Sequence, residues 1–304
     1  MKVLILINQT SNQYFPIDDD ERFVPIYRNT GLFFRAIRKI ILKLNLPFKK
    51  LLFGHFHKKA VAADMIILFD IRNAREILMY LKKEYPEKKI IFWYWNPVCK
   101  ADPVQSINDL GIEIWSFDPV DCKKYGLKYN TQIFIDRKTT ECNDKNTDVF
   151  YVGVDKNRAK TLTMLAKLFK ENDISYYFNL VRTKDSEADC EIQYGNTMNY
   201  SEVLSYVKSS KVIVDLCAVG QSGLTLRPIE SIFLKKKIIT NMNSIVEYDI
   251  YNKNNIFILG EDDIENLKEF IRSEYDETNN PELLKKYEFE SWLHRFYEGE
   301  EARK

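Results

Sequence analysis

The sequence KVIVDLCAVGQSGLTLRPIESIFLKKKIIT, from Lys211 to Thr240, decides the fold. It begins with a continuous apolar run, passes through a loop with two glycines, continues as a short apolar helix and ends in a second apolar run. Apolar runs without alternation are typical of parallel strands that are buried on both faces. A strand, a helix and a second parallel strand make a βαβ unit, and such units build doubly wound sheets.

The same alternation of apolar runs and amphipathic segments recurs along the whole chain. It is interrupted once, by the polar stretch RKTTECNDKNTD at 137–148. We therefore expect an α/β fold of two Rossmann-like doubly wound domains that face a cleft. The predicted strands lie at 2–8, 64–70, 89–95, 112–117, 149–154, 174–181, 211–217, 237–240 and 255–259.

The polar stretch is the best candidate for a linker between two domains. We expect an N-terminal domain over 1–140 and a C-terminal domain over 145–304, which is consistent with a chain of 304 residues. The final helix, PELLKKYEFESWLHRFY (281–297), carries many aromatic residues. It could pack in the core of the second domain or cross back to brace the first.

Composition excludes several classes of protein. Apolar residues make up 45% of the chain, which is enough for a sizeable core, and a net charge of +1 gives no overall signature of nucleic-acid binding. The five scattered cysteines favour a reducing cytosol and argue against a zinc site. No stretch approaches the roughly 20 apolar residues of a membrane span. We expect a cytoplasmic protein without a metal or cofactor.

A first candidate site for an anion follows the predicted strand at 149–154. The strand ends near Gly153, and the turn after it carries Lys156 and Arg158 ahead of a helix. Ligands of doubly wound sheets lie outside the carboxyl ends of the strands, and helix N-termini favour anions. Lys156 or Arg158 could therefore pair with a phosphate, although no G-x-G-x-x-G fingerprint is present. The alternative is an ordinary turn with solvated charges.

The loop inside the deciding stretch offers a second anion site. Pro228 fits only the first turn of a helix, so the backbone N–H groups of Gly223, Leu224 and Thr225 lie just ahead of the helix start. Arg227 could add a charge-assisted hydrogen bond to a phosphate. A glutamate suits a pair of hydroxyls, such as a ribose diol, and Glu230 lies one turn into the helix. The alternative is an ion pair between Arg227 and Glu230 at the surface.

These segments, in this order, resemble the nucleotide-sugar-binding domain of bacterial GT-B glycosyltransferases, most closely those of lipopolysaccharide and capsule biosynthesis. The resemblance covers about residues 147–297 and implies that the C-terminal domain binds the donor and the N-terminal domain the acceptor. By matching positions, Gly153 and Arg158 would lie near the diphosphate and Ser222 to Thr225 would donate backbone N–H groups to it. The resemblance also implies that Glu230 holds the ribose and that Asn241 lies close to the donor sugar.

The function implied by the resemblance is metal-independent transfer of a hexosyl or related group. The donor would be a nucleotide-diphosphate sugar, and the acceptor a hydroxyl of a bacterial surface glycan or of its lipid-linked precursor. One departure matters, because many retaining enzymes of this fold carry a glutamate at the position that Gly223 occupies here. The stereochemical outcome is therefore not carried over. A GT-B-like nucleotide-sugar epimerase and a non-catalytic nucleotide-sugar-binding partner protein stay open as alternatives.

An inverting transferase needs a base that deprotonates the acceptor hydroxyl. Asp18, Asp19 and Asp20, in the loop after the first strand, are candidates, although three successive aspartates can also be a solvated loop. His55 and His57 are rivals. We expect this H-x-H pair on one side of a strand.

The segment from 28 to 59 contains nine Lys or Arg residues and no acid. Its predicted helix combines an apolar stripe that includes Phe33, Phe34 and Ile40 with several cations. A basic amphipathic helix is typical of a contact with an anionic membrane surface. We therefore expect peripheral association with the inner face of the plasma membrane. The alternative is a helix that packs its stripe into the core and leaves its basic face solvated.

Overall fold

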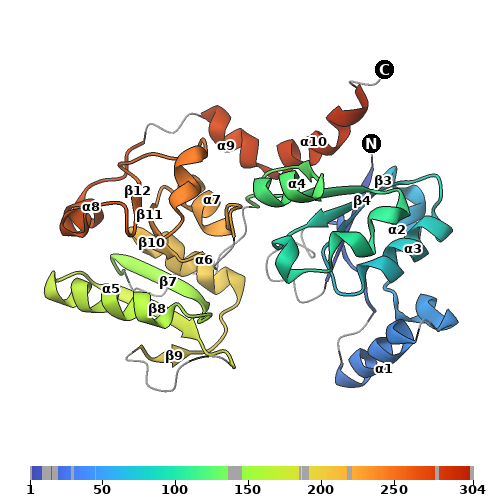
Figure 1. Ribbon diagram of the computed structural model, residues 1–304, viewed down its shortest axis with the longest axis horizontal. Coiled ribbons are helices and arrows are strands. Elements are labelled where there is room, and N and C mark those ends of the chain that lie inside the picture. Colours follow the sequence, from blue (N-terminus) through green and yellow to red (C-terminus); the bar gives the residue numbers. More distant parts are fainter. Residues whose placement is uncertain are drawn as a thin grey trace. The chain divides into compact units, whose positions relative to one another are not determined.

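The computed structural model describes residues 2–8, 15, 20–28, 31–44, 46–135, 146–184, 186, 192–217, 221–277 and 281–301. The chain divides into two compact units, Met1–Asn130 (unit 1) and Thr131–Lys304 (unit 2). Most of the predicted linker at 137–148 lies outside the described residues. Figure 1 shows a sheet with helices in each unit.

The described part of unit 1 forms a six-stranded sheet in the order β2-β1-β3-β4-β5-β6, with every pair of neighbours parallel. Its strands are β1 (Val3–Ile7), β2 (Phe23–Pro25), β3 (Met65–Phe69), β4 (Lys89–Tyr94), β5 (Glu113–Ser116) and β6 (Lys128–Tyr129). Its helices are α1 (Leu32–Lys43), α2 (His57–Ala62), α3 (Ala74–Glu84), α4 (Pro119–Tyr125) and the 3-10 segments η2 (Pro47–Leu52), η3 (Val98–Lys100), η4 (Val104–Ser106) and η5 (Asn108–Leu110).

The sheet of unit 2, within the described residues, also has six parallel strands, in the order β12-β11-β10-β7-β8-β9. Its strands are β7 (Val149–Val154), β8 (Tyr176–Val181), β9 (Tyr194–Gly195), β10 (Val212–Asp215), β11 (Lys237–Thr240) and β12 (Ile256–Ile258). Its helices are α5 (Ala159–Glu171), α6 (Tyr200–Ser209), α7 (Leu226–Phe233), α8 (Leu267–Arg272), α9 (Pro281–Tyr287), α10 (Phe289–Glu301) and the 3-10 segments η6 (Asn243–Glu247) and η7 (Ile264–Asn266). The predicted fold class, α/β with two Rossmann-like parallel sheets, is confirmed.

Local chemistry explains where individual helices begin and end. Asp118 caps α4 by accepting hydrogen bonds from the N–H groups of Val120 and Asp121, and Gly126 ends the helix at a φ of 66°. Asn199 caps α6 in the same way. All five residues of β3 are buried, as expected of a central strand covered on both faces. Every helix in the described ranges falls short of the length and apolarity of a membrane span.

Candidate functional site

The strand order of unit 2 creates a candidate site at the carboxyl ends of β7 and β10. These two strands are neighbours, and the chain continues from them toward opposite edges of the sheet. Such a switch point leaves a crevice outside the strand ends, where ligands of doubly wound proteins bind. Gly153 lies near the end of β7, and Lys156 and Arg158 lie in the turn after it. The other predicted donor-binding residues lie in the loop after β10 or in α7, except Asn241, which directly follows β11.

The turn after β7 is held by Asp155. Its carboxylate accepts hydrogen bonds from the N–H groups of Arg158 and Ala159, each at 3.1 Å, and from the Tyr194 hydroxyl at 2.7 Å. Although burial raises the pKa of Asp155, hydrogen bonds that include that of Tyr194 bring it below its ordinary value. Asp155 is therefore an ionised residue that shapes the turn. It leaves Lys156 exposed beside the strand end.

Two buried polar atoms beside this turn have no hydrogen-bond partner among the described residues. They are the hydroxyl of Tyr151 and the Nε of Arg158. The other end of the Arg158 guanidinium donates from Nη1 to the Val154 carbonyl at 3.0 Å. Gly153 makes room between them, since a Cβ there would lie 2.6 Å from the Tyr151 hydroxyl. The Arg158 guanidinium lies close enough to the Tyr151 hydroxyl to oppose the rise that burial causes in the pKa of that hydroxyl. Buried polar groups are rarely left unpaired, so these two donors are candidates for contact with a ligand at this strand end.

Asp215, the last residue of β10, lies close enough to both arginines of the predicted site for their charges to act on its carboxylate. It is buried, and its carboxylate accepts a 2.9 Å hydrogen bond from the Thr225 hydroxyl. Burial raises the pKa of Asp215, while the Thr225 hydrogen bond and the charges of Arg227 and Arg158 act in the opposite direction. The segments after β7 and β10 therefore converge on one carboxylate.

The loop before α7 is tied to its surroundings at several points. Thr225 is the N-cap of α7, because its side chain accepts from the N–H of Arg227 at 3.1 Å. The Ser222 carbonyl accepts from the Tyr248 hydroxyl at 2.8 Å, and Leu224 is buried in the core of unit 2. Gly223 is also buried. These contacts hold the conformation of the loop from residue 221, where its described part begins, to the start of α7.

Glu230 has no exposed surface, and its carboxylate is already engaged. It accepts a 2.5 Å hydrogen bond from the Tyr200 hydroxyl and forms an ion pair with Arg227. The alternative of an Arg227–Glu230 pair is therefore realised in the structure, but the pair is buried rather than at the surface. Removing one partner of a buried pair leaves an uncompensated charge, so the two side chains hold each other in place.

Asn241, the residue after β11, links two strand ends. Its Oδ1 accepts from the N–H of Cys217 at 2.7 Å, and its Nδ2 donates to the Cys217 carbonyl at 3.5 Å. The side chain therefore fixes the start of the loop that leads to α7. Asn241 is exposed at the carboxyl edge of the sheet.

The candidate bases of unit 1 are not brought together in the structure. Asp18 and Asp19 lie outside the described residues. Asp20 forms a hydrogen-bonded ion pair with Arg22; burial raises its pKa, but the contacts with Arg22 bring it below its ordinary value. A carboxylate of this kind is a weak base.

The prediction that the H-x-H pair lies on a strand is wrong. His57 is the first residue of α2, and His55 lies in the turn before it. The ring of His57 lies 2.7 Å from the hydroxyl of Tyr85, the residue after α3. Since α3 returns from the carboxyl edge to the amino edge of the sheet, His57 lies on the side away from the strand ends at which ligands bind.

The sequence interpretation overlooked Asp70, which directly follows β3. Its carboxylate accepts from the N–H of Trp95 at 2.8 Å and from the Nδ2 of Asn96 at 2.9 Å. Burial raises its pKa to about 6, against the opposing effect of these hydrogen bonds. A carboxylate that ends an apolar strand was the available signal. The predicted strand at 64–70 includes Asp70, whereas β3 ends one residue earlier, at Phe69.

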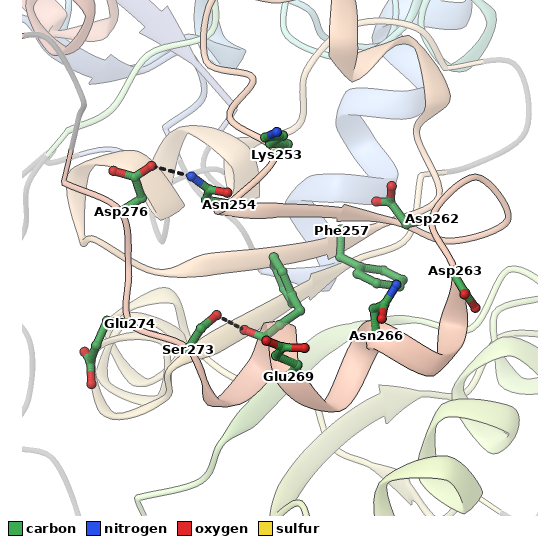
Figure 2. Close-up of a pocket in the computed structure, with 11 residues that line it drawn as sticks. Lys253, Asn254, Phe257, Asp262, Asp263, Asn266, Glu269, Ser273, Glu274 and Asp276 are labelled. Carbon is green, nitrogen blue, oxygen red and sulfur yellow. Dashed lines mark hydrogen bonds between the residues drawn. The ribbon is translucent and has the colours of Figure 1, made fainter.

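A hollow beside β12 and α8 has a different chemistry. Figure 2 shows five carboxylates and one lysine around it, with the Asn254 amide bonded to Asp276. None of the predicted donor-binding residues lines the hollow, and its negative charge would repel a diphosphate. Within the described residues, no three His, Cys, Asp or Glu side chains come together as a metal-binding set.

The helix α1 exposes most of its apolar stripe. The exposed fractions are 84% for Leu32, 72% for Phe33 and 54% for Ile40. Among the residues of α1 whose burial is described, only Leu42 is buried, and Arg38 lies 4.0 Å above the ring of Tyr27. The alternative of a stripe packed into the core does not describe this helix, which Figure 1 shows at the margin of unit 1.

Comparisons with known proteins show the fold. No family model matches the sequence, and no curated protein is significantly similar to it. Among solved structures, the chain is similar to sucrose-phosphate synthase from Thermosynechococcus elongatus, with 10% identity, a TM-score of 0.55 and all of both chains covered. It is also similar to HepE from Anabaena in complex with UDP, with 8% identity, a TM-score of 0.52 and 99% and 100% of the two chains covered.

A third similar structure is a UDP-N-acetylglucosamine 2-epimerase from Listeria monocytogenes. It has 9% identity and a TM-score of 0.46 over 98% of this chain and 95% of that chain. At such identities these similarities concern the fold alone. The TM-score of the epimerase structure lies below 0.5, so its similarity does not bear on the function of this chain. The fold is that of GT-B proteins, with two Rossmann-like units.

Proposed function

We propose that this protein is a glycosyltransferase that moves a hexosyl or related group from a nucleotide-diphosphate donor to a sugar hydroxyl. The observation that carries the proposal is the cluster at the switch point of unit 2. There, Arg158 and Arg227 flank the buried Asp215, and two buried donors have no protein partner. The fold is similar to that of HepE, whose structure contains UDP, which supports the same assignment.

In this proposal the donor diphosphate lies against the ends of β7 and β10. Arg158, Lys156 and Arg227 supply positive charge, and the backbone of Ser222 to Thr225 and the N-terminus of α7 supply N–H donors. A charge-assisted hydrogen bond contributes about 1.5–3 kcal/mol. The unpaired Tyr151 hydroxyl and Arg158 Nε add two donors that lose nothing by turning to a ligand.

The ribose would be held by Glu230 and the donor sugar would lie near Asn241. Because Glu230 has no exposed surface, ribose binding requires its carboxylate to exchange the hydrogen bond from Tyr200, or that from Arg227, for ribose hydroxyls. The same exchange would free Arg227 to turn toward the diphosphate. The buried pair thus accounts for how one ligand could engage both residues together.

The chemistry would be displacement at the anomeric carbon of the donor sugar. The diphosphate leaves with the electron pair of the broken C–O bond, and the cations and N–H groups around it stabilise the developing charge. We propose that these groups take the place of a metal ion. Activity that persists at full rate in EDTA supports this, and activity that is lost in EDTA and restored by Mg²⁺ contradicts it.

We further propose that α1 and the basic segment 28–59 bind an anionic membrane surface, so that the acceptor is a lipid-linked precursor of a bacterial surface glycan. The exposed apolar residues of α1 would insert among the lipids while Arg35 and Lys39, both exposed, meet the headgroups. Each cation near such a surface contributes about 1 kcal/mol.

The experiment that tests the function follows the release of nucleoside diphosphate from UDP-, GDP- and dTDP-sugars, with and without octyl glycosides or a bacterial lipid extract as acceptor. Release that depends on acceptor supports a transferase. Conversion of the donor sugar without acceptor would instead show an isomerase, and nucleotide binding without turnover a binding protein. Either of these results contradicts the proposal.

A further inference from the structure

The sheet of unit 1 has its own switch point, between β1 and β3. β2 lies on one side of β1, and β3 to β6 continue on the other side. A ligand of unit 1 is therefore expected outside the carboxyl ends of these strands. Asp70 is the first residue beyond the end of β3, and Trp95 and Asn96 are the first two beyond the end of the neighbouring β4.

The carboxylate of Asp70 is oriented by neutral groups only. Oδ1 accepts from the backbone of Trp95 and Oδ2 from the side chain of Asn96, and Asp70 forms no ion pair within the described residues. The backbone of Asn96 also lies close enough to lower the pKa of the carboxylate. A carboxylate has about four lone-pair sites, so it can accept a further hydrogen bond from a hydroxyl. A hydrogen-bonded carboxylate without a cation keeps its basicity, in contrast to Asp20 beside Arg22.

An aromatic cluster adjoins this carboxylate. The indole of Trp95 packs edge-on against Phe15, at 4.7 Å between ring centroids, and at a tilt against Phe69, at 5.9 Å. It nevertheless stays partly exposed. Sugars present both hydroxyls and apolar C–H groups. A fixed, partly exposed indole beside a carboxylate and an amide offers both kinds of contact.

From this juxtaposition we propose that Asp70 is the base that accepts the proton of the acceptor hydroxyl, with Trp95 and Asn96 positioning the acceptor sugar. This inference rests on the proposed transferase function. As the proton passes to an oxygen of Asp70, the acceptor oxygen bonds to the anomeric carbon of the donor. The bond from that carbon to the diphosphate breaks, its electron pair leaves with the diphosphate, and Asp70 later returns the proton to water.

The ionisable groups near Asp70 determine whether another ionisation would alter the pH dependence of the transfer rate. Tyr94 of β4 has a raised pKa, mainly through burial and then through Asp102, Asp70 and Asp121, and its hydroxyl donates to the Asp102 carbonyl. Arg72, which follows Asp70 by two residues, is exposed. Tyr94 stays neutral throughout the working range of pH. The rate of transfer should therefore rise as Asp70 ionises near pH 6 and level off above it.

The test compares Asp70→Asn with the control variant Asp64→Asn. Asp64 directly precedes the other end of β3, is exposed, and accepts a hydrogen bond from the backbone N–H of Lys2. Transfer to octyl glycosides and the dissociation constant of UDP are measured from pH 5 to 9. Asp70→Asn should lower kcat by about 100-fold or more and abolish the rise near pH 6, while UDP binding stays within about twofold. Asp64→Asn should change neither quantity.

Two further measurements keep the outcome clear. Carboxyl ¹³C NMR should show one signal that titrates near pH 6 in the wild type and is missing in Asp70→Asn. Trp95→Ala should raise KM for the acceptor more than it lowers kcat. If sugar is transferred and Asp70→Asn keeps the rate and the pH profile, the role of Asp70 is refuted and the transferase stands. If the wild type transfers sugar from no donor, the proposed function fails and the role of Asp70 fails with it.

Discussion

The hydroxyl of Thr225 donates a 2.9 Å hydrogen bond to the carboxylate of Asp215. The same oxygen accepts from the N–H of Arg227, so one hydroxyl both caps α7 and fixes the helix to the end of β10. Asp215 in turn lies within reach of the charges of Arg158 and Arg227. The position of the candidate anion site therefore depends on a side chain that carries no charge.

Replacing Thr225 by valine tests this dependence. The variant keeps the shape of threonine but loses the cap and the bond to Asp215. We expect the free energy of unfolding, measured by urea denaturation, to fall by about 1–3 kcal/mol. Thr225→Ser keeps the hydroxyl and should remain close to the wild type. Equal stability of the valine and serine variants would show that the hydroxyl does not hold α7.

Replacing Tyr151 by phenylalanine should leave stability unchanged or slightly raised, because the hydroxyl is buried without a partner. If that hydroxyl donates to the donor diphosphate, the dissociation constant of UDP should rise by about 2- to 10-fold in calorimetric titrations. Tyr200→Phe is the matched control, since it removes the bond to Glu230 and should lower stability. Unchanged UDP affinity in Tyr151→Phe would remove Tyr151 from the site.

The proposed role of Glu230 is best tested with glutamine. Alanine would leave Arg227 buried without its partner, which costs about 3–5 kcal/mol and would confuse a loss of binding with a loss of folding. Glu230→Gln removes the compensating charge as well, but it keeps the size of the side chain and an oxygen that can accept from Arg227, and the Tm of the variant without nucleotide shows whether it folds. The rise in Tm that UDP or another matching nucleotide causes should be abolished in the folded variant. Glu269→Gln, on the exposed face of α8, should keep that rise in full. A full nucleotide-induced rise in Glu230→Gln would show that the ribose is held elsewhere.

The proposed membrane surface is tested by replacing Phe33 and Phe34 together with serine. Both rings are exposed, at 72% and 48%, so the double variant should keep the Tm of the wild type. Co-sedimentation with vesicles that contain phosphatidylglycerol should weaken by about 10-fold or more, because burying one phenylalanine contributes about 1.5–3 kcal/mol. Met164→Ser, on α5, removes an equally exposed side chain from unit 2 and should bind as the wild type does.

The sequence predicted the central strands and several helices closely. β7 and β11 match their predicted bounds, because continuous apolar runs mark them. The edge strands β2, β6 and β9 were not predicted. They have only two or three residues, which is too few for a periodic pattern, and they exist because a neighbouring strand offers hydrogen bonds.

The site was harder to predict, because its contacts join residues far apart in the sequence. The sequence predicted Arg158, Thr225 and Arg227 ahead of or at helix starts, and in the structure Arg158 and Thr225 are the N-cap residues of α5 and α7 while Arg227 lies in the first turn of α7. It gave no sign that Tyr200 would reach Glu230 across 30 residues, or that Asp155 and Asp215 would be the carboxylates that shape the site. Burial decides whether a charged residue meets a ligand or a neighbour, and burial follows from the packing of the whole unit.

The strand orders of the two units have a consequence for comparing the two halves of the chain. In the described part of unit 1, two strands lie on one side of the switch point and four on the other, whereas in the described part of unit 2 three lie on each side. A tandem duplication that preserved its connectivity would have produced the same order twice. The two sheets therefore do not share one strand connectivity, and the place of a residue in one unit does not predict the place of a counterpart in the other.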